Sequence, residues 1–344
     1  MPAGRSGRRD AGRRVLITGV STRLGTQLAR RLEADPYFSH VAGVDTRPPR
    51  ATLGRLEFIE ADIRQPSVMS RLAGTRFDAL VHNNILRQPW PGMSPGAAHD
   101  TNVIGSLQLL AACERIEDLE TIVVRGSAGI YGSEPAAPQF FTEEMARLYP
   151  LRTRFQRDVG EIEDYFATFS HRHPSVTCTM LRYQPAVGPA LDTQVTRYLG
   201  QAVVPTFLGY DPRLQFVHES DAVEALVAAV KHPVAGAVNV AGPGTIGLTR
   251  AIRLARKRTL PIPAPLFGTT TGAGRRLGVR PLSPDFQRLL QYGRAVDITR
   301  LTEEVGYRPR YSTVEAVRDY VDRGSTVQPP PRPARPRPRP AARA

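Results

Sequence analysis

The sequence predicts an α/β protein with a doubly wound parallel sheet. Short apolar runs alternate with helix-length amphipathic segments through the first half of the 344-residue chain. A turn bounded by two glycines follows the first apolar run, and an acidic residue closes the second one. Strands that alternate with helices pair in parallel, because a parallel crossover needs a helix-length connection. With 41% hydrophobic residues, the chain can bury a large core.

Six apolar runs of strand length stand in the first half of the chain. They cover residues 14–18, 40–45, 56–62, 78–83, 121–127 and 176–183. Between them we expect a helix from about Leu24, a short helix after the third strand, a helix through Asn102 to Cys113, and a helix from about Arg152. This succession predicts a nucleotide-binding domain over residues 14–185.

After Gly188 and Pro189 the pattern changes to shorter elements rich in proline and glycine. Such a mixture favours a smaller C-terminal α/β lobe that shapes a substrate cleft against the carboxyl edge of the sheet. We therefore expect a substrate-binding lobe over residues 186–323, from which a late strand or helix could return to the first domain.

Much of the net charge of +14 lies at the two ends of the chain. Residues 1–14 carry +4 and residues 324–344 carry +5, which leaves +5 for the body. We expect disordered basic tails over residues 1–13 and 324–344, the second rich in proline and arginine. Proline-spaced arginine lacks aromatic residues for base stacking, so we expect weak contact with anionic surfaces and no specific nucleic-acid binding.

Two further observations concern location and cysteine chemistry. No apolar run approaches the roughly 20 residues of a membrane helix, and no apolar core follows the N-terminal arginines as in a signal peptide. We expect a cytoplasmic protein. Cys113 and Cys178 each stand inside an apolar segment, which predicts buried free thiols and neither a disulfide nor a metal site.

The turn after the first strand has the Gly-x-x-x-x-x-Gly skeleton of a dinucleotide-binding loop. The N–H groups at the start of the next helix would bind a pyrophosphate. The middle glycine of the usual pattern is Thr22, so the loop is one element short, and an ordinary glycine-containing turn remains the alternative. The residues that we expect to bind the cofactor here are Gly19, Ser21, Thr22, Arg23, Leu24 and Gly25.

Asp45 ends the second strand, about 20 residues after the loop. A carboxylate at this place accepts hydrogen bonds from both ribose hydroxyls of NAD and repels the 2′-phosphate of NADP. The predicted cofactor is therefore NAD, with NADP left open by Arg47 two residues later. An acidic residue that ends a strand is also a common turn former, which is the alternative interpretation.

An ordered series of motifs resembles the extended short-chain dehydrogenase/reductase family. The motifs are Thr18-Gly19 with Leu24-Gly25; Ala61-Asp62-Ile63-Arg64; Val81-His82-Asn83-Asn84; Asn102; Gly126-Ser127-Ala128-Gly129-Ile130-Tyr131-Gly132; Leu181-Arg182-Tyr183 before Gly188-Pro189; Phe216-Val217-His218 with Asp221; Asn239; and Gly306-Tyr307-x-Pro309. The chain is similar to the NAD-dependent epimerase/dehydratase group of that family, typified by UDP-galactose 4-epimerases, from Val15 to about Arg323. The resemblance implies a Rossmann-type fold, an NAD cofactor and a nucleotide-sugar or other small-molecule ligand.

The resemblance also implies roles for single residues. Ser127 would polarise a substrate carbonyl. Family members often form homodimers through two helices, one of which begins near Arg152 here, and the apolar Val159, Ile162 and Phe166 would serve that face. Beyond the loop and Asp45, the implied cofactor contacts are Asp62 and Ile63 at adenine, His82, Asn83 and Asn84 along the ribose and diphosphate, Asn102 behind the nearby backbone, and Tyr183.

The catalytic Tyr-x-x-x-Lys of the family is absent. The aligned segment has Phe155 and Val159 at the two positions, and Glu163 follows at the spacing that relatives show. A phenyl ring cannot donate a proton and an isopropyl group cannot carry charge. Tyr149 and Tyr165 have no lysine four residues later, and no lysine occurs between Ser127 and Arg182.

The second lobe departs from the family in the same direction. Residues 214–218 (LQFVH) replace the Arg-Asp-Tyr-Ile-His type of segment that helps epimerases to hold a nucleotide diphosphate, with Arg213 one place early. This weakens the case for a nucleotide sugar. We expect His218 and Asp221 to have structural roles.

Three functional hypotheses follow. The first is a divergent member that binds NAD(H) as a cofactor-responsive binding or scaffold protein. The second is an active NAD-dependent epimerase, dehydratase or hydroxysteroid-type dehydrogenase that moves protons through Ser127, Asn83, His82 or another tyrosine. The third is an adaptor held on polyanions by its basic tails. The loss of both catalytic side chains places the first hypothesis ahead of the second.

Overall fold

The computed structural model describes residues 12–72, 75–87, 93–116, 118–267 and 282–324. The expected tails lie outside these residues, apart from Gly12, Arg13 and Gly324. Within the described part of the chain, no helix is long and apolar enough to cross a membrane. The same residues include no group of His, Cys, Asp and Glu that could hold a metal ion.

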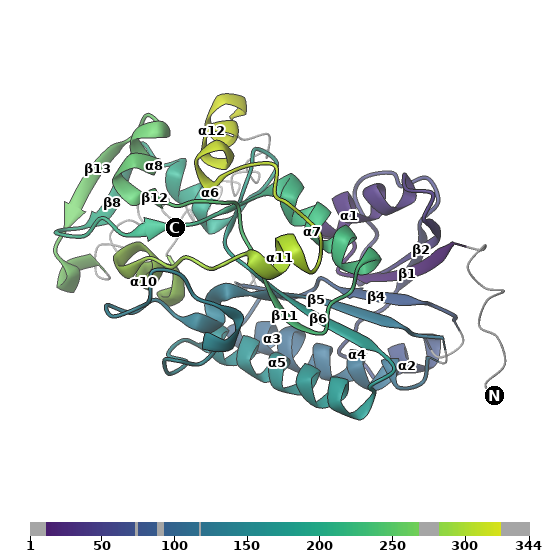
Figure 1. The fold of residues 1–344 in the computed structure, drawn as a ribbon. Coiled ribbons are helices and arrows are strands. Elements are labelled where there is room, and N and C mark those ends of the chain that lie inside the picture. Colours follow the sequence, from purple (N-terminus) through teal and green to yellow (C-terminus); the bar gives the residue numbers. More distant parts are fainter. Residues whose placement is uncertain (1–11, 73–74, 88–92, 117, 268–281, 325–344) are drawn as a thin grey trace, which may run out of the picture.

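Seven parallel strands form the large sheet at the centre of the molecule (Figure 1). The six strands expected in the first half of the chain are all present, which confirms the doubly wound fold. The chain order reverses at β1, which pairs with β4 on one side and β2 on the other, so the carboxyl ends of β1 and β4 border the crevice where such folds bind ligands. In sheet order the strands are β11 (Gly236–Val240), β6 (Thr177–Tyr183), β5 (Thr121–Ser127), β4 (Ala79–His82), β1 (Arg13–Thr18), β2 (Phe38–Asp45) and β3 (Glu57–Glu60).

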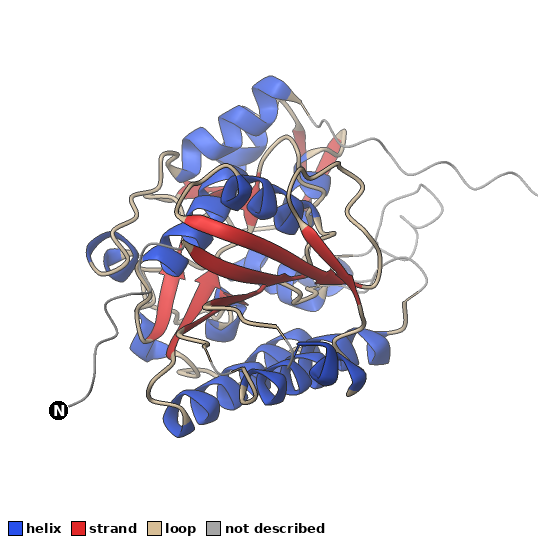
Figure 2. Cartoon of the chain, turned by 90° about the vertical axis from the view of Figure 1, so that its right-hand side faces the viewer, coloured by secondary structure: helices blue, strands red, loops and turns tan. Residues whose placement is uncertain are grey.

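Helices cover both faces of this sheet (Figure 2). Successive strand residues point to opposite faces, so Val15 and Ile17 join one core and Leu16 joins the other. Cys113 and Cys178 are buried free thiols in the second core, as expected. One face carries α1 (Arg23–Glu33), α7 (Glu219–Lys231) and α11 (Thr299–Glu303), and the other carries α2 (Ser67–Leu72), α4 (Gly105–Cys113) and α5 (Arg154–Arg172).

Helix α5 buries the apolar positions that the sequence suggested for a dimer face. Val159, Ile162 and Phe166 are 1%, 1% and 5% exposed. Ile162 and Phe166 pack into the core beneath the sheet, and Val159 packs into a small cluster with Ile130 and Phe141. The expectation that these three side chains serve an interface between copies is therefore wrong, because the fold of one chain already covers them.

The second lobe has its own core, separate from the two cores of the large sheet. Its elements are β7 (Ala186–Val187), α6 (Gln194–Leu199), β8 (Val203–Phe207), β9 (Arg213–Leu214), β10 (Val217–His218), β12 (Ile246–Gly247), α8 (Leu248–Leu254), β13 (Arg258–Ile262), α10 (Pro284–Tyr292) and α12 (Thr313–Arg323). These strands form three two-stranded pairs, β10 with β7, β12 with β9 and β13 with β8. From the same stretch of sequence, α7, β11 and α11 return to the large sheet.

His218 and Asp221 hold this return in place. The ring nitrogens of His218 lie 2.7 Å from Ser220 Oγ and 3.1 Å from Asp319 Oδ2. The carboxylate of Asp221 accepts hydrogen bonds from the Tyr307 hydroxyl and from the N–H groups of Arg310 and Tyr311, over 2.7–3.0 Å. Both side chains thus join the start of α7 to the C-terminal segment.

Candidate functional site

The loop between β1 and α1 closes tightly on itself. Gly19 has a φ of +67°, a backbone conformation that residues other than glycine rarely adopt. A Cβ on Gly25 would lie 2.2 Å from the carbonyl oxygen of Gly19, so glycine is required at that position as well. This close approach of helix and strand is the geometry that a dinucleotide-binding loop needs.

Thr22, which stands in place of the middle glycine, is the N-cap of α1. Its hydroxyl donates to the Gly19 carbonyl at 2.7 Å and accepts from the Gly25 N–H at 3.0 Å. One N–H of the first turn is therefore satisfied inside the protein. Those of Arg23 and Leu24 have no acceptor within the helix.

Asp45 braces the loop from the end of β2. One carboxylate oxygen accepts from the Ser21 N–H at 3.0 Å, and the other accepts from the Thr46 N–H at 2.8 Å. The Ser21 hydroxyl in turn donates to the Arg47 carbonyl. Because a carboxylate oxygen has two acceptor positions, Asp45 can still accept hydrogen bonds from a ligand.

The residues expected near adenine lie after β3. The carboxylate of Asp62 accepts from the guanidinium of Arg64 at 2.5–3.0 Å, and these bonds hold the pKa of Asp62 below its usual range. Ile63 is buried against Gly105 at the start of α4. Asp62 is thus an ionised, braced side chain at the edge of the crevice.

His82 is built into the core between sheet and helix. Its Nδ1 lies 2.7 Å from Thr18 Oγ1 and its Nε2 lies 2.8 Å from Ser106 Oγ. Because Ser106 donates its own proton to the Asn102 carbonyl, Nε2 carries the hydrogen of a neutral ring. Burial, assisted by the charge of Arg125, lowers the pKa of His82 to about 4. These contacts leave neither ring nitrogen for a cofactor or for proton transfer at neutral pH.

Asn83 joins β4 to the loop after β1. Its side-chain amide donates to Thr22 Oγ1 at 3.0 Å, while its Oδ1 is buried with no hydrogen-bond partner among the described residues. Its neighbour Asn84 packs against Gly19. A buried acceptor without a partner is costly, so the loop has unused capacity for a donor.

Asn102 lies in a π-helical turn, η2 (Asp100–Ile104), and clamps the backbone that follows β4. Its Oδ1 accepts from the Leu86 N–H at 2.7 Å, and its Nδ2 donates to the Leu86 carbonyl at 2.9 Å. The same amide lies 3.3 Å from the Asp158 carboxylate, which also contacts His99 Nδ1 at 2.8 Å. Asn102 therefore holds the backbone of Leu86, which lines the cavity described below.

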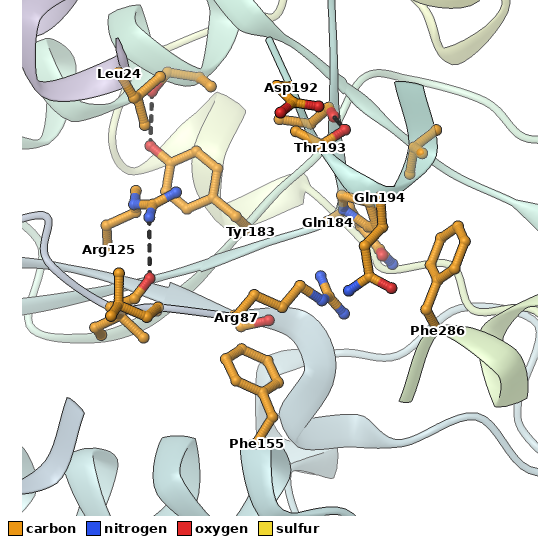
Figure 3. Close-up of a pocket in the computed structure, with 18 of the residues that line it drawn as sticks. Leu24, Arg87, Arg125, Phe155, Tyr183, Gln184, Asp192, Thr193, Gln194 and Phe286 are labelled. Carbon is orange, nitrogen blue, oxygen red and sulfur yellow. Dashed lines mark hydrogen bonds between the residues drawn. The ribbon is translucent and has the colours of Figure 1, made fainter. Parts of the chain in front are cut away.

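A cavity of about 300 Å³ lies at the carboxyl ends of the strands, between the large sheet and the second lobe (Figure 3). It runs from Leu24 at the start of α1 to Phe286 in α10. Its lining from the first domain includes Ile85, Leu86, Arg87, Arg125, Gly126, Ser127, Phe155 and Tyr183, and its lining from the second lobe includes Gln184, Asp192, Thr193, Gln194, Val195 and Arg197.

Phe155 and Ser127 lie together in this cavity. The Ser127 hydroxyl accepts a hydrogen bond from the Gly129 N–H at 3.0 Å, and a Cβ on Gly129 would lie 3.2 Å from the Phe155 ring. Val159, one turn along α5 from Phe155, does not line the cavity. Phe155 thus places its ring in the cavity, and Val159 is a buried aliphatic side chain outside it.

Two tyrosines near Ser127, Tyr183 and Tyr131, have hydroxyl groups that donate hydrogen bonds within the protein. Tyr183 pairs with Ser127 across β5 and β6, but its hydroxyl donates to the Ala222 carbonyl at 2.9 Å, and burial raises its pKa. The Tyr131 hydroxyl donates to Asn239 Oδ1 at 2.7 Å, and burial raises its pKa to about 12. Neither phenol is poised to exchange a proton at neutral pH.

Two cavity residues escaped the sequence analysis. Arg87 follows β4 and Arg125 lies within β5, and both guanidinium groups reach the cavity. The signal for Arg125 was present, because a charged residue inside an apolar strand is rarely buried without a reason. Arg87 stands in a loop after β4, where no pattern of the sequence marked it.

A doubly wound parallel sheet with a tight glycine loop at its switch point defines a Rossmann-type nucleotide-binding fold. The model of the NAD dependent epimerase/dehydratase family matches residues 15–241. The chain therefore belongs to that family.

Comparison with known proteins finds similarity over most of the chain. An uncharacterised protein of Mycobacterium tuberculosis is 36% identical over 312 residues, which are 89% of this chain and 82% of the relative. The structure of UDP-glucose 4-epimerase with UDP-glucose from Thermotoga maritima has a TM-score of 0.71 at 19% identity and covers 90% of this chain and 98% of its own. dTDP-glucose 4,6-dehydratase from Bacillus anthracis in complex with NAD has a TM-score of 0.68 at 14% identity, covering 90% and 96%. At these sequence identities, the two structures show only that the chain shares their fold.

Proposed function

We propose that this protein binds NAD(H) and works as a cofactor-responsive binding protein without tyrosine-based catalysis. The observation that carries the proposal is the apolar pair at Phe155 and Val159. Phe155 lines the cavity beside Ser127, and Val159 is 1% exposed in an apolar cluster. Neither side chain can transfer a proton or lower the pKa of a phenol.

The residues at the crevice fit the cofactor. Arg23 and Leu24 offer first-turn N–H groups to a diphosphate. Asp45 has acceptor capacity for ribose hydroxyls, and its charge disfavours the 2′-phosphate of NADP. The dehydratase of Bacillus anthracis, with the same fold, was solved in complex with NAD. NAD would supply a hydride-accepting nicotinamide when bound.

A second candidate is an active nucleotide-sugar epimerase or dehydratase that uses Ser127. The observation that favours it is the position of the Ser127 hydroxyl in the cavity, where it accepts from Gly129 and keeps its own proton for a substrate oxygen. Turnover of UDP-glucose or UDP-galactose that disappears in Ser127→Ala would establish this candidate over the first.

Calorimetric titration of NADH tests the proposal. Asp45→Asn should weaken NADH binding at least tenfold, whereas the matched change Asp322→Asn, at an exposed residue of α12, should leave it unchanged. Equal affinity in both variants, or no binding by the parent protein, contradicts the cofactor assignment.

Restoring the family pair tests the catalytic half of the proposal. The double variant Phe155→Tyr with Val159→Lys should gain epimerase activity that neither single variant shows, because phenol and ammonium act together. Thermal melting of each variant checks that the buried lysine has not unfolded the protein. Activity in the parent protein equal to that of the double variant would refute the loss of catalysis.

A further inference from the structure

Arg125 is an unusual residue for the floor of this cavity. It lies in β5, two residues before Ser127, and its guanidinium donates from Nη2 to the Ile85 carbonyl at 3.3 Å. Its Nε is buried with no hydrogen-bond partner, and no carboxylate among the described residues forms an ion pair with it. Burial lowers its pKa accordingly. Arg125 is half-buried, and a cation with a buried Nε and no counter-ion among the described residues is costly, so its retention calls for a partner that these residues do not supply.

Arg87 adds a second guanidinium to the same cavity. It pairs with the buried carboxylate of Asp285, and its Nε is also buried without a hydrogen-bond partner in the part of the chain that the structure describes. Asp285 serves more than one cation, because Arg294 and Arg288 also lower its pKa through their charges. Asp192 is the carboxylate in the cavity lining, and it pairs with Arg197 at 2.8 Å. The charges that face the cavity therefore sum to an excess of positive charge.

The surfaces between the two guanidinium groups suit a small organic anion. Figure 3 shows Arg125 beside Tyr183 and Arg87 between Phe155 and Gln194. The guanidinium carbon of Arg87 lies 5.2 Å from the centre of the Phe155 ring. Phe155 offers an apolar face, and the Gln194 amide, which donates one hydrogen bond to Ser283 Oγ at 3.0 Å, has a second N–H to donate.

We propose that this cavity is a binding site for the carboxylate or phosphate group of a small ligand, held by Arg125 with Arg87. Guanidinium groups bind both kinds of anion through paired N–H donors. The body of the ligand lies against Phe155. In this proposal Phe155, at the position of the family's catalytic tyrosine, contacts the ligand body, while the arginines bind its charged group. The anchoring groups, Arg125 in β5 and Arg87 after β4, are not residues of the loop after β1, so the site is tested first without NAD(H).

Paired probes of equal shape test the site in the absence of NAD(H). Benzoate carries a carboxylate, benzamide is its neutral counterpart, and inorganic phosphate is the other anion. Calorimetry at low salt should give benzoate at least tenfold tighter binding than benzamide. Stronger binding of phosphate than of benzoate would assign the site to phosphoryl ligands, and the reverse would assign it to carboxylates. Equal binding of benzoate and benzamide, or no binding of either anion, would overturn the proposal.

Matched variants locate the binding. Arg125→Gln should weaken anion binding at least tenfold and should not lower the melting temperature, because it removes an unpaired buried charge. Arg154→Gln, at an exposed arginine of α5, is the control and should bind as the parent does. Arg125→Lys keeps the charge and should retain part of the affinity, and Arg87→Gln gives a second test if Arg125→Gln does not fold. Unchanged binding in Arg125→Gln, or in Arg87→Gln where the first variant fails, refutes the assignment. Asp45→Asn should leave anion binding intact. The experiments can therefore show a failure of the NAD(H) proposal independently of a failure of the anion-site proposal.

Discussion

The side-chain amide of Asn83 donates a hydrogen bond to the hydroxyl of Thr22 at 3.0 Å. Thr22 stands in place of the middle glycine of the usual loop, and Asn83 with Asn84 stands where the family that the sequence resembles usually has two alanines. In the fold they meet, because β1 and β4 are neighbours and their carboxyl ends lie side by side. The two substitutions look independent in the sequence, but in the fold their side chains form one hydrogen bond that joins the loop after β1 to the end of β4.

We predict that the effects of Thr22→Gly and Asn83→Ala on stability are not additive. Each single change removes one partner of this bond and leaves the other in place, whereas the double change removes both partners. The coupling free energy from urea unfolding should be about 1 kcal/mol. Additive effects would show that the 3.0 Å contact is not a stabilising hydrogen bond.

His82 should make stability depend on pH in the acid range. Its folded pKa of about 4 lies below the unfolded value of 6.5, so the unfolded state binds the proton first and stability falls as pH drops from about 6.5 toward 4. Between pH 7 and pH 5 the loss should be about 2 kcal/mol. The variant His82→Gln should lose this share of the pH dependence, measured by urea unfolding at both pH values. His232→Gln, an exposed histidine at the end of α7, should keep it.

Replacing Gly25 with alanine should destabilise the protein, whereas the same change at Gly54 should have almost no effect on stability. A Cβ on Gly25 meets the Gly19 carbonyl at 2.2 Å, whereas a Cβ on Gly54 meets nothing within 4 Å. Gly25→Ala should cost about 3 kcal/mol and weaken NADH binding, and Gly54→Ala should change stability by less than about 0.5 kcal/mol. A well-folded Gly25→Ala variant with parental NADH affinity would mean that the loop does not hold the cofactor.

The sequence predicted the parts of the fold that depend on local pattern. Alternation of apolar runs and helices was sufficient for the six strands around β1, and the spacing of Gly19, Gly25 and Asp45 identified the loop and its brace. The order of these motifs also identified the family, and the match of the family model to residues 15–241 confirms it.

What the sequence could not predict depends on contacts between distant residues. The clamp of Asn102 on Leu86 and the neutral ring of His82 between Thr18 and Ser106 require the packed sheet and helix. Helix periodicity could not tell whether Val159 faces a partner copy or the core of its own chain. The cationic cavity arises because Arg87 and Arg125, 38 positions apart, converge at neighbouring strand ends.

The central claim is that the site binds a dinucleotide without turning over a nucleotide sugar. One measurement tests it most directly: calorimetric titration of NADH into the protein, with the same sample then supplied with NAD and UDP-glucose or UDP-galactose and assayed for epimerised sugar. We predict saturable NADH binding and no epimerised product. Absence of NADH binding, or product formation that Ser127→Ala abolishes, would contradict the account.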